Sequence, residues 1–228
     1  GTITVGDIDV SKDKQSLREI LGYLPQEFGV YPKISANDLL DHLAVMKGIT
    51  DTKQRKEVVE SLLYQTNLWE AKDQKLGTYS GGMKQRFGIA QALIGDPKLI
   101  IVDEPTAGLD PMERNRFHNL LSEIGENVIV ILSTHIVDDV SDLCNNMAII
   151  LNGEVHLVGE PIQLIKTLDQ KVWKGLIEKS DLVEIEKEND VISSRLYLGK
   201  VQVRIFSESP MQNGFESVNP EIEDLYFA

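Results

Sequence analysis

The sequence predicts an α/β fold built on a mostly parallel sheet, and this prediction rests on three observations. The runs "KLIIVDE" and "NVIVILST" are almost continuously apolar, which is typical of strands buried on both faces of a parallel sheet. The segment "DPMERNRFHNLLSEIG" between them has a helical pattern, so strand, helix and strand follow one another as in a right-handed crossover. After residue 168, short alternating runs indicate a small antiparallel appendage.

Composition narrows the class of protein. A chain of 228 residues, 42% of them hydrophobic, has enough apolar side chains for one large domain or for one domain with an appendage. The net charge of −13 argues against a nucleic-acid binder, which usually presents a basic face. The single cysteine, Cys144, excludes an internal disulfide framework and favours a reducing, cytosolic setting. No apolar run approaches about 18 residues, so the sequence predicts no membrane-spanning segment.

The N-terminal residues predict two strands. Residues 1–10, "GTITVGDIDV", alternate apolar and polar side chains as one strand would. They also lack the basic start and the long apolar centre of a signal peptide. The stretch "REILGYLPQ" predicts a second short strand that ends at Pro25.

Residues 35–94 are expected to be mostly helical. A first helix over residues 35–47 has Ser35 as its cap, and a second covers residues 52–66. A third begins after Ser80 and runs to about Ile94, where "GDP" ends it. The side chains expected to face the core are Leu39, Leu40, Leu43 and Met46 on the first helix and Val58, Val59, Leu62 and Leu63 on the second.

Capping and turn signals predict the remaining elements. The helix between the two apolar runs has Asp110 as its cap and Pro111 in its first turn. The stretch "IVDDVSDLC" predicts a further helix, and "MAIILNGEVHLV" predicts a hairpin that turns at Asn152-Gly153. The C-terminal stretch "NPEIEDLYFA" predicts a short helix.

Two adjacent carboxylates, Asp103 and Glu104, end the first apolar run. In open α/β sheets ligands bind at the carboxyl ends of the strands, and a carboxylate beside phosphates there needs a cation, for which Mg²⁺ is the usual choice. Glu104 is expected on the opposite side of the strand, where it can orient or deprotonate an attacking water. The alternative is an ordinary strand that ends in solvent, and the pair alone does not decide between them.

The stretch "YSGGMKQR", residues 79–86, opens the third helix with Ser80, Gly81 and Gly82. The N-terminus of a helix presents free N–H groups and a partial positive charge, and glycines let a phosphate approach the backbone. Two glycines weaken a helix by roughly 1 kcal/mol each, so a use for them is expected. The alternative is a plain capped helix, because serine is a favoured cap.

His135 and Gln26 each follow a predicted strand. His135 comes after "VIVILST" and emerges at the same sheet edge as Asp103 if the two strands are parallel neighbours. At that edge a histidine can bind a terminal phosphate, although a lone histidine is more often structural. Gln26, in "LPQEFGVYP", ends a strand at a turn, where it can coordinate a metal or hold a water, or simply be a solvated loop residue.

Taken in order over residues 20–140, these motifs resemble the nucleotide-binding domain of ABC transporters. Gln26 resembles the Q-loop, "YSGGMKQR" the signature, "LIIVDE" Walker B, "AGLDP" the D-loop, and "STH" the H-loop. The signature has Tyr79 and Met83 where the common form has Leu and Gln, and it keeps the Ser-Gly-Gly core. The resemblance implies a P-loop-NTPase-like sheet with a helical subdomain in residues 1–168, followed by a small appendage in residues 169–228.

The resemblance also implies roles for these residues. Asp103 and Gln26 would serve Mg²⁺, Glu104 would act as general base with Gln26 at the water, and His135 would hold the γ-phosphate of ATP. Two domains would pair head to tail, as a homodimer or with another ATPase subunit. The groups that would then reach the nucleotide on the partner subunit are Ser80, Gly81, Gly82 and Asp110.

The resemblance further implies integral membrane permease subunits as partners and a place on the inner face of the cell membrane, with no nucleic-acid partner. The segment "EFGVYPKIS" is apolar and aromatic for a loop, which suits a docking site. The tail after "GEPIQLI" is similar to that of ATPase subunits of exporters of drugs, lipids or small hydrophobic molecules. The alternatives are a soluble ABC-type ATPase acting on ribosomes or DNA, and a regulatory module without catalysis.

The phosphate-binding loop G-x-x-x-x-G-K-[ST] does not occur in these residues. In the family it lies upstream of a strand like residues 1–10, so we expect the chain to lack its N-terminal segment and its sheet to have a gap. Because that loop holds the phosphates, we expect this chain alone neither to bind ATP tightly nor to turn it over. A degenerate subunit that lends only its signature motif is the rival explanation, although Glu104 and His135 would then be unnecessary.

Overall fold

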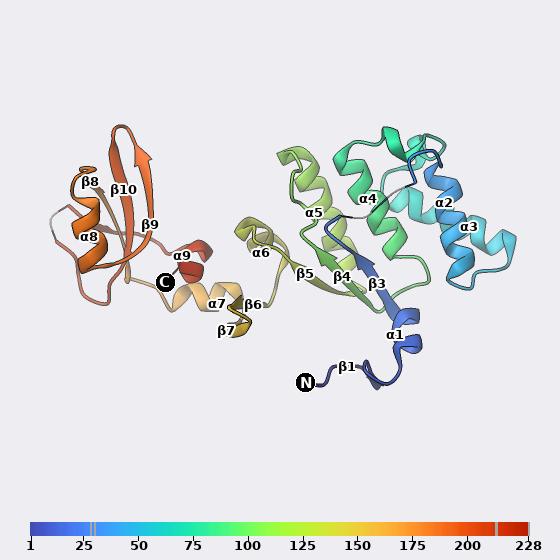
Figure 1. Cartoon of the computed structure of the whole chain (residues 1–228), viewed down its shortest axis with the longest axis horizontal. Coiled ribbons are helices and arrows are strands. Elements are labelled where there is room, and N and C mark those ends of the chain that lie inside the picture. Colours follow the sequence, from blue (N-terminus) through green and yellow to red (C-terminus); the bar gives the residue numbers. More distant parts are fainter. Residues whose placement is uncertain (28, 30, 213, 228) are drawn as a thin grey trace. The chain divides into compact units, whose positions relative to one another are not determined.

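The computed structural model describes residues 1–27, 29, 31–212 and 214–227. The chain forms two compact units, Gly1–His135 and Ile136–Ala228, which are described here one at a time (Figure 1). The predicted α/β class, with its helical subdomain and its antiparallel appendage, is confirmed. The domain boundary expected after residue 168 stays a prediction.

A parallel sheet forms the centre of the first unit (Figure 1). Its strands stand in the order β3 (Leu21–Leu24), β4 (Leu99–Asp103) and β5 (Ile129–Ser133), and each hydrogen-bonds its neighbour. The expected gap therefore does not fall between these strands. The strand predicted from "REILGYLPQ" begins only at Leu21, because α1 (Lys14–Ile20) takes up the residues before it.

One face of this sheet is covered by α4 (Gly81–Ala92) and α5 (Pro111–Gly125), as Figure 1 shows. The packing is close, since a Cβ atom on Gly22 of β3 would lie 2.3 Å from the carbonyl oxygen of Ala92. Helix α4 ends at Ala92, slightly earlier than the predicted Ile94.

The prediction that β5 is buried on both faces is wrong for the described residues. Ile129 is 68% exposed and Ile131 is 51% exposed, and the pattern alternates along the strand. Ile131 stands in register with Ile101 and Tyr23, and Tyr23 is also 51% exposed. An apolar run predicts a strand, but it does not show whether each face of that strand is covered. Here α4 and α5 cover the face of the sheet opposite to the one on which Ile129 and Ile131 lie.

The helical subdomain packs α2 (Ala36–Met46) and α3 (Thr52–Gln65) against α4, with the short turns η1 (Trp69–Ala71) and η2 (Leu76–Thr78) between them. Ser35 caps α2 by accepting a hydrogen bond from the Asp38 N–H at 3.1 Å, as predicted. Most of the predicted core face is confirmed. Met46 is the exception and is 72% exposed, because it is the last residue of α2. The fully buried side chains here include Leu40, Leu63, Leu68, Leu76 and Phe87.

Residues 1–10 form a small hairpin, not the single strand that alternation predicted. Strands β1 (Thr4–Val5) and β2 (Ile8–Asp9) pair antiparallel. The chain reverses at Gly6, whose φ of 56° lies in the left-handed region that glycine adopts without steric cost. Glycine inside an alternating pattern therefore marked a turn here.

The second unit begins with α6 (Val137–Leu143) and the hairpin of β6 (Met147–Leu151) and β7 (Glu154–Gly159). The predicted turn is confirmed, with Asn152 at φ 52° and Gly153 at φ 82°. Cys144 follows α6 and is half-buried. Burial and then the nearby charge of Asp139 raise the pKa of its thiol, so the thiol is a poor nucleophile at neutral pH.

The rest of the second unit is an antiparallel sheet in the order β11-β8-β10-β9. Its strands are β8 (Val172–Ile177), β9 (Asp190–Tyr197), β10 (Lys200–Phe206) and β11 (Glu216–Ser217). Helices α7 (Pro161–Lys166), α8 (Leu182–Glu188) and α9 (Ile222–Phe227) complete it, and α9 is the predicted C-terminal helix. Val201, Val203 and Ile205 of β10 form its apolar centre.

Candidate functional site

The carboxyl ends of β3, β4 and β5 meet at one edge of the sheet because the strands are parallel. Gln26 follows β3, Asp103 and Glu104 lie at the end of β4, and His135 follows β5. The structure therefore places these four predicted residues at the same sheet edge.

Asp103 is oriented by the neighbouring strand. It stands opposite Ser133 in the parallel register, and the Ser133 hydroxyl donates a hydrogen bond of 2.5 Å to Asp103 Oδ1. The serine was not among the predicted site residues. The register that brought His135 to this edge also identifies Ser133, because the last residues of two paired strands face each other.

Glu104 adopts a backbone conformation that is unusual for its residue type. Its φ of 46° is in the left-handed region, which costs roughly 1–2 kcal/mol for a side chain other than glycine. Its N–H donates to the Ser133 carbonyl at 2.8 Å, and its Oε2 lies 2.7 Å from Nδ1 of His135. Because β4 ends at Asp103, strand alternation does not decide the side to which Glu104 points.

The Glu104 side chain is 19% exposed, whereas that of His135 is 72% exposed. The contact is an ion pair when the imidazole is protonated, and Glu104 Oε2 is buried without a hydrogen-bond partner. Gln26 lies at the same edge with an exposed side chain. The carboxylate of Glu104 is therefore held from the β5 side, and Gln26 is open to solvent.

Asp103 and Ser133 offer oxygen atoms only, which suits a hard cation such as Mg²⁺. Within the described part of the chain no group of three or more His, Cys, Asp or Glu side chains is arranged to hold a metal ion. A magnesium ion at Asp103 would thus need further oxygens from phosphates and water, and Mg²⁺ commonly binds in that way. The residues fit a Mg²⁺–phosphate complex and do not form a closed metal cage.

The predicted phosphate-binding helix terminus is the start of α4. Ser80 Oγ accepts a hydrogen bond of 3.2 Å from the Met83 N–H, so the serine caps the helix. Gly81 is exposed, whereas Gly82 is buried. The first glycine is open to a ligand, and the second packs inside the protein.

Asp110 caps α5 in the same manner, because its Oδ1 accepts a hydrogen bond of 2.9 Å from the Glu113 N–H. Its side chain is exposed. Gly81 and Leu109 lie close together, since a Cβ atom on Gly81 would be 3.8 Å from Leu109 Cδ2. The first turns of α4 and α5 are therefore neighbours.

Comparison with known proteins shows similarity to ABC transporter ATP-binding proteins. The profile of the ABC transporter family matches residues 1–107. The ABC transporter ATP-binding protein YxlF of Bacillus subtilis is 34% identical over 194 residues, which cover 85% of this chain and 65% of YxlF. The linearmycin resistance ATP-binding protein LnrL of the same organism is 36% identical over 74% of this chain and 54% of its own length.

Residues 1–107 match the ABC transporter family, and the chain resembles ABC transporter ATP-binding proteins over most of its length.

Two further comparisons give the same similarity. The probable multidrug ABC transporter ATP-binding protein YbhF of Escherichia coli is 34% identical over 74% of this chain and 29% of its own length. The ATP-binding cassette MJ0796, solved as a dimer in a post-hydrolysis state bound to ADP and Pi, superposes with a TM-score of 0.61. It is 24% identical, covers 70% of this chain and 73% of its own, and so shows the shared fold. The chain spans 65% or less of the length of these curated relatives.

Sequence reasoning missed the charged residues that link α4, which carries the signature-like stretch, to α5. Arg86 of α4 forms a short ion pair with Glu113 of α5, and Arg116 contacts the same carboxylate at 2.8 Å. Arg86 ends the quoted signature stretch, but nothing in the sequence identified its partner, because the two residues belong to different helices. The burial of Gly82 beneath Glu113 was missed for the same reason.

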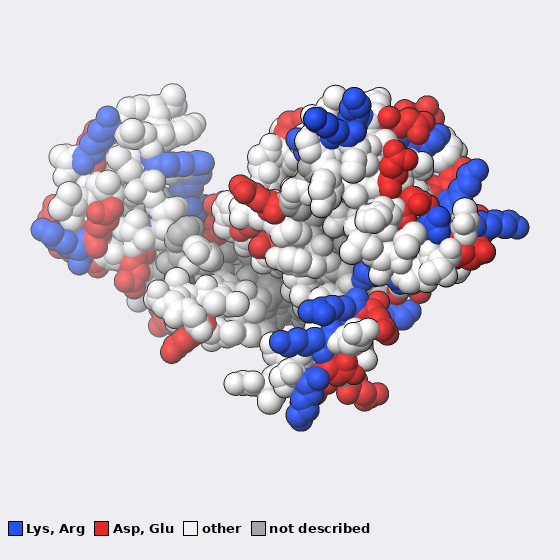
Figure 2. All heavy atoms as spheres, turned by 45° about the vertical axis from the view of Figure 1, so that its right-hand side comes forward, with Lys and Arg blue, Asp and Glu red and all other residues white. Residues whose placement is uncertain are grey.

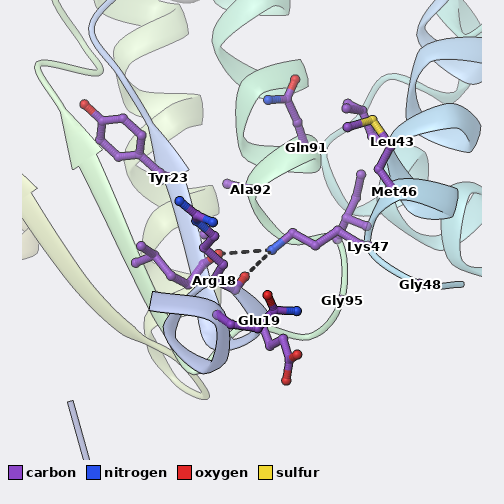
Figure 3. A pocket seen from close by; sticks show the side chains of 14 residues that line it. Arg18, Glu19, Tyr23, Leu43, Met46, Lys47, Gly48, Gln91, Ala92 and Gly95 are labelled. Carbon is purple, nitrogen blue, oxygen red and sulfur yellow. Dashed lines mark hydrogen bonds between the residues drawn. The ribbon is translucent and has the colours of Figure 1, made fainter. Parts of the chain in front are cut away.

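A cavity of about 900 Å³ lies elsewhere in the first unit, beside β3, the edge strand of the three-stranded sheet among the described residues (Figure 3). Lys47 crosses it and donates hydrogen bonds to the carbonyl oxygens of Arg18 at 2.9 Å and Leu21 at 3.2 Å. Burial lowers the pKa of Lys47. A lysine that caps an outward-facing strand carbonyl blocks the pairing of a further strand, so we interpret Lys47 as protection of the sheet edge.

Proposed function

We propose that this chain is part of an ATP-binding and ATP-hydrolysing subunit that powers a membrane transporter. The observation that carries the proposal is the cluster at the carboxyl edge of the sheet. There Asp103 is oriented by Ser133, and Glu104 is held 2.7 Å from His135. A metal-binding carboxylate next to a second, separately held carboxylate is the arrangement that phosphoryl transfer to water requires.

In this proposal the four predicted residues and Ser133 share the binding of the metal and the activation of the water. Asp103 and the Ser133 hydroxyl would hold Mg²⁺ at the nucleotide phosphates, where a bound cation would supply compensation for their negative charge. Glu104 accepts a proton from the attacking water, and His135 fixes the direction of that carboxylate besides contacting the γ-phosphate. Gln26 is exposed at the same edge and completes the contacts to metal and water.

Nucleotide binding is proposed to involve two domains. Ser80, Gly81, Gly82 and Asp110 lie on the neighbouring first turns of α4 and α5 and would meet the nucleotide held by a partner. Gly82 is buried, so it packs beneath this turn and does not face the ligand. Ser80, Gly81 and Asp110 are exposed and remain accessible. The dimeric, ADP- and Pi-bound state of MJ0796 supports this pairing.

The 228-residue chain alone is proposed to be inactive, because it contains no G-x-x-x-x-G-K-[ST] loop to hold the phosphates. Titration calorimetry with Mg-ATP should detect no micromolar binding, and the chain should release no phosphate above background. Micromolar binding to the chain alone would overturn this part of the proposal. A chimera with a strand–loop–helix segment carrying the loop placed before residue 1 should gain ATPase activity that Glu104→Gln removes.

The transporter is proposed to be an exporter of drugs, lipids or small hydrophobic molecules, at the inner face of the membrane. LnrL and YbhF support this by their names, which refer to linearmycin resistance and to multidrug transport. Tyr31 and Ile34, 66% and 37% exposed, offer apolar contacts in the expected docking segment, whose Phe28 and Val30 lie outside the described residues. No described helix has the length and apolar character needed to cross a bilayer.

Co-purification tests the partner. The tagged chain is expressed in the organism that it comes from and purified in mild detergent. An integral membrane protein should co-purify with it. Recovery of ribosomes or DNA in its place would favour the alternative of a soluble ABC-type ATPase. On the face shown in Figure 2 acidic and basic side chains are interspersed, and together with the net charge of −13 this argues against a nucleic-acid partner.

A further inference from the structure

Glu113 joins the two helices whose first turns carry the proposed nucleotide contacts. It lies in the first turn of α5, three residues after the cap Asp110. Its N–H donates a hydrogen bond of 2.9 Å to Asp110 Oδ1. Its carboxylate reaches across to the first turn of α4. A Cβ atom on Gly82 would lie 2.1 Å from Glu113 Oε2 and 2.6 Å from its Cδ. Glycine at position 82 is therefore what lets the carboxylate occupy this place.

Two arginines hold the carboxylate there. Arg86, one turn along α4 from Gly82, forms a short ion pair with Oε2, and Arg116 of α5 contacts Oε1 at 2.8 Å. The side chains of Arg86 and Glu113 are only 9% and 15% exposed. Charge-assisted hydrogen bonds at such low exposure are strong and directional, so the two helix starts are linked at a defined distance.

The electrostatics favour the same arrangement. A carboxylate near the N-termini of two helices is stabilised by both helix dipoles.

We propose that Glu113 is a positioning residue, which sets the spacing and orientation of the Ser80 turn relative to the Asp110 turn through Arg86 and Gly82. This inference rests on the proposed function, in which both turns contact the same nucleotide on the partner subunit. Two groups that contact one ligand must be held together, since a misplacement of about 1 Å can cost about 10²-fold in rate.

The competing explanation is that the ion pair only stabilises the fold. A matched control exists in the same unit, where Arg55 of α3 contacts Asp41 of α2 with Nε 2.6 Å from Oδ1. Asp41→Asn should cost stability without touching α5. Comparison of the two substitutions separates loss of stability from loss of helix placement.

The experiment measures the distance between α4 and α5 in the folded chain. Spin labels are attached to cysteines introduced at Lys84 and Asn115, with Cys144 replaced by serine, and pulsed electron resonance gives the distance distribution. Glu113→Gln should broaden or shift the distribution, because a neutral amide cannot satisfy both arginines. Gly82→Ala should do the same by displacing the carboxylate, and it serves as the second variant should Glu113→Gln fold poorly. Asp41→Asn should leave the distribution unchanged.

An unchanged distribution in folded Glu113→Gln and Gly82→Ala would overturn the proposal, whatever their thermal stability. The measurement needs no nucleotide, so its outcome is independent of ATP binding. Failure of the proposed function would appear in the ATP titrations and co-purification, and failure of the positioning role would appear here.

Discussion

At the scale of single residues, Glu104 combines an unfavourable backbone with a constrained side chain. Its left-handed φ of 46° is a conformation that asparagine and glycine tolerate much better. Its contact with a histidine that is 72% exposed adds little stability, since exposed ion pairs contribute about 0–1 kcal/mol. Backbone strain that local contacts do not offset is typical of functional positions. We infer that position 104 is not optimised for stability.

This inference predicts that Glu104→Asn raises the free energy of unfolding of the first unit by about 1 kcal/mol, because asparagine lowers the cost of the left-handed backbone. Urea denaturation followed by circular dichroism measures the change. His135→Ala is the control, since it removes the same contact and keeps the strained glutamate, and it should change stability by less than about 1 kcal/mol. A clear loss of stability in Glu104→Asn would show that the side-chain contact outweighs the strain.

At the scale of elements, local signals in the sequence predicted most helices and strands, and contacts between distant elements explain the failures. Ser35, Ser80 and Asp110 cap their helices as predicted because capping involves only neighbouring residues. The exposure of Ile131 was not predictable, because an apolar strand residue does not reveal whether its face is covered. Likewise the placement of Gly82 under Glu113 depends on the packing of α4 against α5.

The candidate site shows the same division. Parallel strands predicted that Asp103 and His135 share a sheet edge, and the register then accounts for Ser133. The left-handed backbone of Glu104 arises where the chain leaves β4, and no pattern of residues predicted it. The residue types of the site and the sheet edge at which they lie could therefore be predicted from the sequence. The orientation of each side chain depends on tertiary structure.

Two hairpin turns of the second unit provide a matched prediction. Asn152-Gly153 and Leu198-Gly199 both have positive φ at each position, with 52° and 82° in the first turn and 49° and 86° in the second. Asparagine suits such a turn, whereas Leu198 is strained and is 89% exposed. Leu198→Asn should therefore stabilise the second unit by about 1 kcal/mol, and Asn152→Leu should destabilise it similarly.

Thermal denaturation of the two variants checks this prediction. Opposite shifts in midpoint are expected from the same exchange of side chains. A lower midpoint for Leu198→Asn would indicate that the leucine side chain makes a stabilising contact despite its exposure.

At the scale of the whole molecule, the chain consists of two units that each possess an apolar core. The first unit buries Leu40, Leu63 and Phe87 in its helical subdomain. The second buries Val203 and Ile205 in its antiparallel sheet. Units with separate cores are expected to unfold in separate cooperative transitions, so a single free energy of unfolding does not describe the chain.

The buried ion pair between Arg204 and Asp224 tests this view. Asp224 is 1% exposed and accepts hydrogen bonds from Arg204 Nε at 2.8 Å and Nη2 at 2.5 Å, which joins α9 to β10 and raises the pKa of Arg204. Asp224→Ala leaves the guanidinium without this partner in a largely buried place, and the loss of one member of such a pair costs about 3 kcal/mol or more.

We therefore expect Asp224→Ala to lower the midpoint of one calorimetric transition and to leave the other unchanged. Leu40→Ala in the first unit is the matched control, because a fully buried leucine should cost about 2–5 kcal/mol and affect only the other transition. Hydrogen exchange assigns each transition to its unit, with faster exchange in β10 for Asp224→Ala and in α2 for Leu40→Ala. If either substitution lowers both midpoints equally, the two units unfold together and the chain behaves as one cooperative structure.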